Sequence, residues 1–168
     1  MLQIYTGNGK GKTTAALGLS LRAAGAGFRV FFAQMMKNTH TSELESLKLL
    51  GDRITVKRFG TGEFIVETPT VKDFECAEQA FAAIEEAALS GQFQMVVADE
   101  MCTALYYELI NRDNLLLLIK NCPPTTELIF TGRYADEEMI GIADLVTEMR
   151  EVKHCYQKNV PARKGIEF

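Results

Sequence analysis

Six short apolar runs recur along the chain and predict β-strands. They span residues 2–6, 28–34, 54–59, 94–99, 127–131 and 145–149. Helical periodicity fills most of the gaps between them, and this alternation predicts a parallel sheet. Two runs, Val30-Phe31-Phe32-Ala33 and Met95-Val96-Val97-Ala98, are apolar at every position, which is typical of strands covered on both faces. We therefore expect an α/β protein with a mostly parallel sheet of about six strands and helices on both faces.

Two of the predicted helices begin with recognisable capping signals. Thr70 and Asp73 have the spacing of a capping box, and apolar residues recur every three or four positions through 71–88. Ser42 and Glu45 have the same spacing ahead of a leucine stripe, so we expect a second capping box there.

Composition narrows the class of protein. The chain has 168 residues, of which 47% are hydrophobic, and a single domain over 1–168 is expected. Its net charge of -4 disfavours a nucleic-acid partner. No run is long enough to span a membrane and no signal-peptide layout is present, so we expect a cytoplasmic protein without a membrane partner. The tail over 150–168 is basic, with five Lys or Arg against two Glu.

A glycine-rich loop between the first strand and the first helix is the most specific motif. It reads Gly7-Asn8-Gly9-Lys10-Gly11-Lys12-Thr13-Thr14. Glycines let successive backbone N–H groups approach phosphate oxygens, and the N-terminus of the following helix adds partial positive charge. We expect Lys12 to reach the terminal phosphates, Thr13 to bind Mg²⁺ and Lys10 to add a second positive charge. The loop therefore predicts a binding site for a nucleoside triphosphate. It departs from the usual phosphate loop in having Thr6 at the position of the first glycine.

Charged residues follow three of the other predicted strands. Asp99 ends the strand over 94–99 and Glu100 follows it, at the place where phosphate-loop proteins put the acid that holds Mg²⁺ opposite the loop threonine. The alternative is that this pair only begins the next helix. Lys37 and Arg133 also follow strands and are candidates for phosphate or substrate contacts. A solvated lysine and a surface turn are the alternatives for these two.

These motifs together resemble the ATP:corrinoid adenosyltransferases of the phosphate-loop class, over nearly the whole chain. The resemblance rests on 6–14, Gln34, Lys37, 60–62 with Phe64, 99–100, 131–133, 143–149, 152–154 and 165–167. It implies a P-loop NTPase fold of the RecA-like type. It also implies ATP as the adenosyl donor, bound by the glycine-rich loop with Lys37 and Arg133, and Mg²⁺ or Mn²⁺ held by Thr13, Asp99 and Glu100.

The resemblance implies a reaction as well. The enzyme would transfer the 5′-deoxyadenosyl group of ATP to the Co(I) centre of a corrinoid and release triphosphate, in adenosylcobalamin synthesis or salvage. Lys10 and Lys12 would be catalytic, because charge develops on the departing triphosphate. Phe64 and Val66 would face the corrin, with Val66 standing where the family has Trp. A flavoprotein that supplies an electron to Co(II) and a second copy in a homodimer are the implied partners.

Two other functions fit the nucleotide loop. A small nucleoside kinase would use Glu100 as its base and form ADP, whereas an adenosyltransferase forms triphosphate. An ATP-gated switch would bind ATP, order the loop over 60–68 and ignore corrinoids.

Overall fold

A computed structural model describes residues 1–37, 40–62, 65 and 68–168 of the chain. It contains a six-stranded sheet in the order β3-β2-β4-β5-β1-β6, and every pair of neighbouring strands is parallel. The strands are β1 (Leu2–Thr6), β2 (Val30–Met35), β3 (Ile54–Phe59), β4 (Met95–Asp99), β5 (Glu127–Thr131) and β6 (Leu145–Glu148). The α/β fold predicted from the apolar runs is confirmed, and the sheet is wholly parallel.

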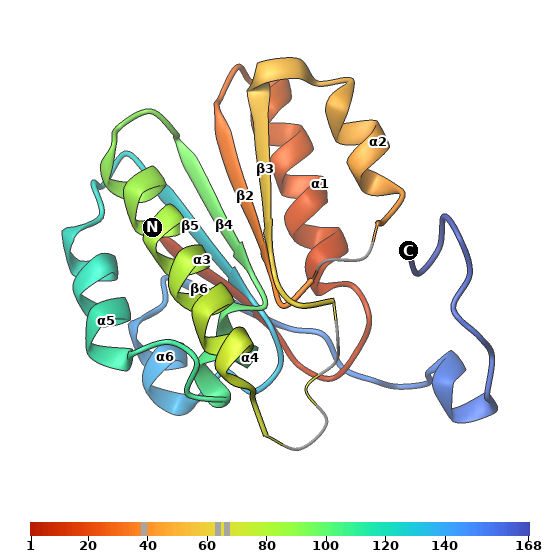
Figure 1. Cartoon of the computed structure of the whole chain (residues 1–168). Helices are drawn as coiled ribbons and strands as arrows, with labels where there is room; N and C mark the ends of the chain where they lie inside the picture. The colour runs from red at the N-terminus through yellow and green to blue at the C-terminus, as the bar shows by residue number, and fades with distance from the viewer. Residues whose placement is uncertain (38–39, 63–64, 66–67) are drawn as a thin grey trace.

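Helices cover the sheet on both sides (Figure 1). They are α1 (Lys12–Gly25), α2 (Glu43–Lys48), α3 (Val71–Leu89), α4 (Met101–Tyr106), α5 (Arg112–Asn121) and α6 (Glu137–Ile142), with 3₁₀ turns η1 (Gly51–Arg53) and η2 (Cys155–Lys158). None of the helices in the described part of the chain is long and apolar enough to cross a membrane.

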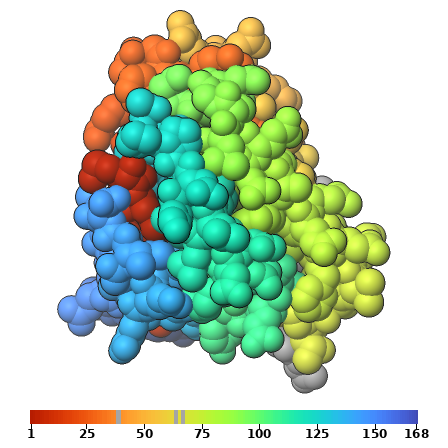
Figure 2. Space-filling view, turned by 90° about the vertical axis from the view of Figure 1, so that its left-hand side faces the viewer, coloured from red at the N-terminus to blue at the C-terminus, as the bar shows by residue number. Residues whose placement is uncertain are grey.

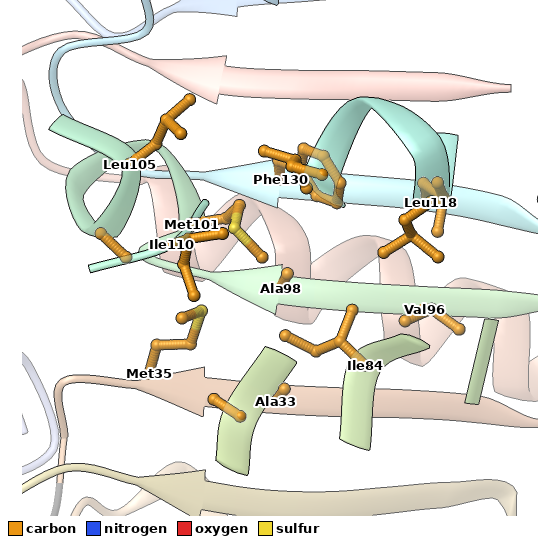
Figure 3. Packing of buried hydrophobic residues seen from close by; sticks show 14 of the residues in the cluster. Ala33, Met35, Ile84, Val96, Ala98, Met101, Leu105, Ile110, Leu118 and Phe130 are labelled. Atoms are coloured by element: carbon orange, nitrogen blue, oxygen red, sulfur yellow. The ribbon is translucent and has the colours of Figure 1, made fainter. Parts of the chain in front are cut away.

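Two hydrophobic cores fill the spaces between the sheet and these helices. On one face, α1 and α2 pack over Tyr5, Phe32 and Val97. On the other face, α3, α4, α5 and α6 cover the opposite side chains of the same strands. Figure 3 shows this larger core, in which Ile84 of α3 and Phe130 of β5 lie over the central strands. In the space-filling view α5 lies between α3 and α6 and closes this face (Figure 2).

Small residues let α1 lie close to the sheet at the loop. Its buried positions are Ala16, Ser20, Ala23 and Ala24, spaced three or four apart on one face. Ser20 satisfies its buried hydroxyl by donating to the carbonyl oxygen of Ala16 at 2.8 Å. These short side chains let α1 pack closely on the sheet, so that its N-terminus lies at the sheet edge together with the glycine-rich loop.

The β6 edge contrasts with the buried centre of the sheet. All four β6 residues are exposed, whereas all five β4 residues are buried. After β6 the chain runs across the end of the sheet and finishes beside α2 (Figure 1). Ser42 there donates a hydrogen bond to the carbonyl oxygen of Phe168 at 3.0 Å.

The two predicted capping boxes have different outcomes. The box at Thr70 is confirmed, because Thr70 and Asp73 exchange hydrogen bonds at the start of α3. The box at Ser42 is wrong: the Ser42 side chain makes no capping hydrogen bond to α2. Its hydroxyl instead donates a hydrogen bond to the Phe168 carbonyl oxygen, and these residues are 126 positions apart in the sequence.

Candidate active site

The carboxyl ends of the parallel strands bring the predicted site residues to one edge of the sheet. The glycine-rich loop follows β1, Lys37 lies two residues beyond β2, and Asp99 and Thr131 end β4 and β5. Because β4 pairs with both β2 and β5, the last residues of these three strands are direct neighbours. Ligands of open α/β sheets bind at this edge.

The loop over residues 7–11 is held from below by the chain that leaves β6. The Gly9 N–H donates to the carbonyl oxygen of Met149 at 2.6 Å. A Cβ on Gly7 or Gly9 would lie 2.5 or 2.7 Å from this same oxygen, so no side chain fits at either position. Gly11 is required for a different reason, because its φ of 127° is unfavourable for other residues. Gly7 and Gly9 therefore let the loop pack directly against the backbone that follows β6.

Lys12 closes the loop from within. Its Nζ donates to the carbonyl oxygens of Gly7 at 2.6 Å and Gly9 at 2.9 Å. Burial lowers the pKa of Lys12, Glu100 and Asp99 oppose this shift, and Arg133 and Lys37 reinforce it. Because its acceptors here are carbonyl oxygens, this ammonium is ready to be paired with an anion in the loop.

Asp99 is the centre of a buried polar group that we call the Asp99 cluster: Thr13, Lys37, Asp99 and Thr131. Asp99 is fully buried. Its carboxylate accepts hydrogen bonds from Thr13 Oγ1 at 3.0 and 3.2 Å, from Thr131 Oγ1 at 2.6 Å and from Lys37 Nζ at 2.6 Å. A buried carboxylate needs such partners, because burial without them is very unfavourable. The cluster therefore connects α1 to the ends of three strands.

Lys37 supplies the positive charge of this cluster. Besides Asp99, its Nζ lies 3.2 Å from Thr13 Oγ1 and 3.8 Å from Glu100 Oε1. Burial acts to lower the pKa of Lys37, but the charges of Asp99 and Glu100 outweigh it and raise the pKa above its ordinary value. Lys37 therefore carries its charge throughout the neutral range.

Glu100 lies in an unusual backbone conformation next to the cluster. Its φ of 69° is left-handed, and its N–H donates to Thr131 Oγ1 at 3.0 Å. Thr103 Oγ1 donates to Glu100 Oε2 at 2.7 Å and accepts from the N–H of Arg133 at 3.1 Å. A Cβ on Gly132 would lie 2.7 Å from the Thr103 nitrogen, so only glycine permits this approach. The Glu100 carboxylate is thereby fixed beside the end of β4.

Lys10 points away from the loop interior and toward the end of the chain. Its Nζ donates to the carbonyl oxygen of Ile166 at 3.0 Å and to Glu167 Oε1 at 2.9 Å. Arg163 also pairs with Glu167, at 3.1 Å. We call these four residues the tail contact. They place the C-terminal residues beside the glycine-rich loop.

Comparison with known proteins decides the family of this site. The model of the ATP:corrinoid adenosyltransferase family BtuR/CobO/CobP matches residues 1–168. The chain belongs to this family. Membership of this family makes the protein an enzyme, a transferase of cobalamin synthesis, as the resemblance of its motifs implied.

Individual relatives extend the comparison over the full chain. A corrinoid adenosyltransferase of Pseudomonas aeruginosa is 34% identical over 170 residues, covering 100% of this chain and 83% of that protein. One from Escherichia coli K12 is 30% identical over 172 residues, covering 98% of this chain and 84% of that protein. Among solved structures, the flagellar accessory protein FlaH of Methanocaldococcus jannaschii matches with a TM-score of 0.58 at 13% identity, covering 88% of this chain and 69% of that one. The likeness to FlaH concerns the fold alone, and it agrees with the predicted α/β architecture.

The oxygen atoms of the adenosyltransferase site suit a divalent cation. The Thr13 hydroxyl and the carboxylates of Asp99 and Glu100 are hard oxygen donors, and all three already surround one positive charge, that of Lys37. Mg²⁺ is commonly bound by one or two carboxylates together with substrate phosphates. Within the described residues, no group of three or more His, Cys, Asp or Glu side chains is placed to hold a metal ion.

Not every predicted site residue of the adenosyltransferase lies in this arrangement. Asn8, Thr14 and Arg133 are exposed at the same edge. Phe64 and Val66 lie outside the described residues. Elsewhere at this edge, Met35, Met36, Phe59 and Leu109 line a small, largely apolar pocket with Asp73, Cys76 and Ala77 of α3.

The sequence analysis assigned no role to two hydroxyls of the site, although Thr131 belongs to the 131–133 segment that carries the resemblance. Thr131 and Thr103 hold Asp99 and Glu100 in place, yet neither belongs to a phosphate-binding motif. A hydroxyl residue at the end of a strand next to the acidic one is a usable signal, but only once the strand order is known. Sequence alone does not order the strands.

Proposed function

We propose that this adenosyltransferase transfers the 5′-deoxyadenosyl group of ATP to the Co(I) centre of a corrinoid and releases triphosphate. The observation that carries the proposal is the family match over residues 1–168. A glycine-rich loop beside a cluster of Mg²⁺-type oxygens adds support, because this chemistry needs a site for the whole triphosphate.

The reaction forms one bond and breaks one. An electron pair of Co(I) attacks C5′ of ATP, a Co–C bond forms, and the C5′–O5′ bond breaks with its electron pair going to the triphosphate. Negative charge therefore grows on the leaving group. We assign its stabilisation to Lys12, to the loop N–H groups and to Lys10, with Lys37 and Arg133 binding further phosphate oxygens. A bound Mg²⁺ or Mn²⁺ would neutralise part of the same charge.

No proton is removed from the nucleophile, so this reaction needs no general base. Glu100 fits that account, because Thr103 donates to one of its carboxylate oxygens and Lys37 lies near the other. We therefore assign Glu100, with Asp99 and Thr13, to metal binding rather than to activation of a hydroxyl group.

The corrinoid is proposed to bind beside the glycine-rich loop, with Phe64 and Val66 facing the macrocycle. A corrin needs an apolar surface. Met35, Met36 and Phe59, at the ends of β2 and β3, are apolar residues near this position and support the proposed placement. A flavoprotein that reduces Co(II), and a homodimer, complete the proposal on the basis of family resemblance.

Product analysis tests this function directly. The protein is mixed with ATP, Mg²⁺ and a chemically reduced corrinoid, and the phosphate product is identified while the corrinoid spectrum is recorded. We expect triphosphate and the adenosylated corrinoid in equal amounts. ADP would indicate phosphoryl transfer, and ATP binding without either product would indicate a switch; each of these results contradicts adenosyl transfer.

A further inference from the structure

The Lys37 ammonium lies among the same oxygens that we assign to the divalent cation. Its Nζ is 2.6 Å from Asp99 Oδ2, 3.2 Å from Thr13 Oγ1 and 3.8 Å from Glu100 Oε1. Each of the three residues assigned to the metal therefore has an oxygen within 4 Å of this ammonium.

Electrostatic repulsion opposes simultaneous binding of the Lys37 ammonium and a divalent cation to these oxygens. Two positive charges this close repel strongly in a partly buried site, and a doubly charged ion doubles the repulsion. One lysine already gives the buried Asp99 carboxylate its neutralising charge. A metal ion that enters must take over this role as Lys37 leaves.

The backbone at Lys37 is held, so the exchange is a movement of its side chain. Met36, the preceding residue, has a left-handed φ of 57°. Gly60 packs so closely that a Cβ there would lie 2.6 Å from the Lys37 nitrogen. The lysine stem can therefore move while its backbone stays in place. The glycine-rich loop after β1 lies at the same edge of the sheet and is where phosphate oxygens would receive the ammonium.

We propose that Lys37 and the divalent cation are alternative occupants of the oxygens of Thr13, Asp99 and Glu100, so that the metal binds tightly only together with the triphosphate that accepts the displaced ammonium. This inference rests on the proposed function for the identity of the triphosphate. It makes Lys37 a residue that couples metal binding to ATP binding, in addition to any contact with phosphate.

Mn²⁺ binding without nucleotide or corrinoid tests the exchange. Free Mn²⁺ is measured by electron paramagnetic resonance as it is titrated into wild-type protein, Lys37→Met and Lys37→Arg. We expect Lys37→Met, which keeps the length of the side chain but not its charge, to bind one Mn²⁺ per chain at least about tenfold more tightly than wild type. Lys37→Arg keeps the charge and should remain weak. Adding Asp99→Asn to Lys37→Met should abolish the gained site.

Equal Mn²⁺ affinity in wild type and Lys37→Met would overturn the exchange. Micromolar binding of one Mn²⁺ by wild-type protein without nucleotide would overturn it too, and this measurement needs no variant. Lys37→Gln, which can still donate to Asp99, serves as a second uncharged variant if Lys37→Met folds poorly. Because neither ATP nor corrinoid is present, the result is independent of the product assay that tests adenosyl transfer.

Discussion

Two lysines of the site are each paired with a carboxylate, but in opposite surroundings. Lys37 meets Asp99, whose side chain is 0% exposed, at the junction of α1, β2, β4 and β5. Lys10 meets Glu167, whose side chain is 26% exposed, and the side chain of Lys10 itself is 48% exposed. The first pair belongs to the Asp99 cluster and the second to the tail contact.

The difference in burial assigns different tasks to the two pairs. Removing one partner of a buried ion pair leaves an uncompensated charge, whereas an exposed pair contributes little and is screened by salt. The Asp99 cluster therefore organises the edge of the sheet. The tail contact is easily exchanged, so Lys10 can pass to a phosphate at small energetic cost. The predictions below test this contrast.

Asp99→Asn should have the largest effect on folding. The substitution keeps the shape of the side chain but leaves the Lys37 charge without its buried partner. We expect the free energy of unfolding to fall by about 3–5 kcal/mol, measured by urea denaturation. Asp113→Asn, on the exposed first turn of α5, is the matched control. A loss below 1 kcal/mol would show that the cluster does not organise the fold.

Lys12→Ala should have the largest effect on catalysis while the fold is retained. The variant removes a positive charge from the loop that is proposed to hold the departing triphosphate. We expect the rate of triphosphate formation to fall by about 10²-fold or more, with ATP and reduced corrinoid both saturating. Lys120→Ala at the exposed end of α5 is the control. Turnover within threefold of wild type would contradict the role given to Lys12.

Thr131→Val should have an intermediate effect on stability. Thr131 donates to Asp99 and accepts from the Glu100 N–H, so valine leaves both groups with one partner fewer at nearly unchanged volume. We expect a loss of about 1–3 kcal/mol in the free energy of unfolding, measured by urea denaturation. Thr125→Val, at an exposed position before β5, should change it little. Equal stability of the two variants would contradict the role given to Thr131 in the Asp99 cluster.

Glu167→Gln should have the smallest effect on stability of these variants, but it should measurably change the affinity for ATP. Because Glu167 competes for the Lys10 ammonium, we expect the variant to bind ATP twofold to threefold more tightly at low salt and the difference to shrink as NaCl is added. Isothermal titration with ATP measures both. Glu151→Gln, exposed near the start of the tail, is the control. Weaker ATP binding by Glu167→Gln would mean that the tail contact positions Lys10 instead of withholding it.

Salt, rather than pH, is the right variable for that experiment. Hydrogen bonds from Arg163 and Lys10 lower the pKa of the Glu167 carboxyl from 4.5 to about 2. A lowered pKa means that the contact is fully present above pH 4.5 and is lost only as the pH falls toward 2. The tail contact therefore stays constant across the neutral range in which activity is measured.

Local patterns in the sequence accounted for most of the fold and for the central motif of the site. The six strands were predicted to within two residues at each end, because buried parallel strands are apolar at consecutive positions. No bounds were predicted for the short helices α4 and α6. With six residues each they are too short for helical periodicity to be visible.

Contacts between distant segments were beyond prediction for a simple reason. Ser42 matched a capping motif, yet its hydroxyl binds the last residue of the chain. Lys10 belonged to the phosphate loop by sequence, yet it meets Glu167 in this structure. Both outcomes depend on where the tail runs, and a local motif carries no information about a segment more than 100 residues away.

The amino-acid sequence by itself determined the parallel α/β class, the glycine-rich loop and, through its motifs, the adenosyltransferase family. These properties depend on residues that are neighbours in the chain. Only the tertiary structure decided that Lys37, Thr13 and Thr131 converge on Asp99, because that meeting depends on the strand order β2-β4-β5 and on α1 crossing beneath it. Strand order is set by the packing of the whole sheet, in which each apolar strand is locally compatible with several neighbours.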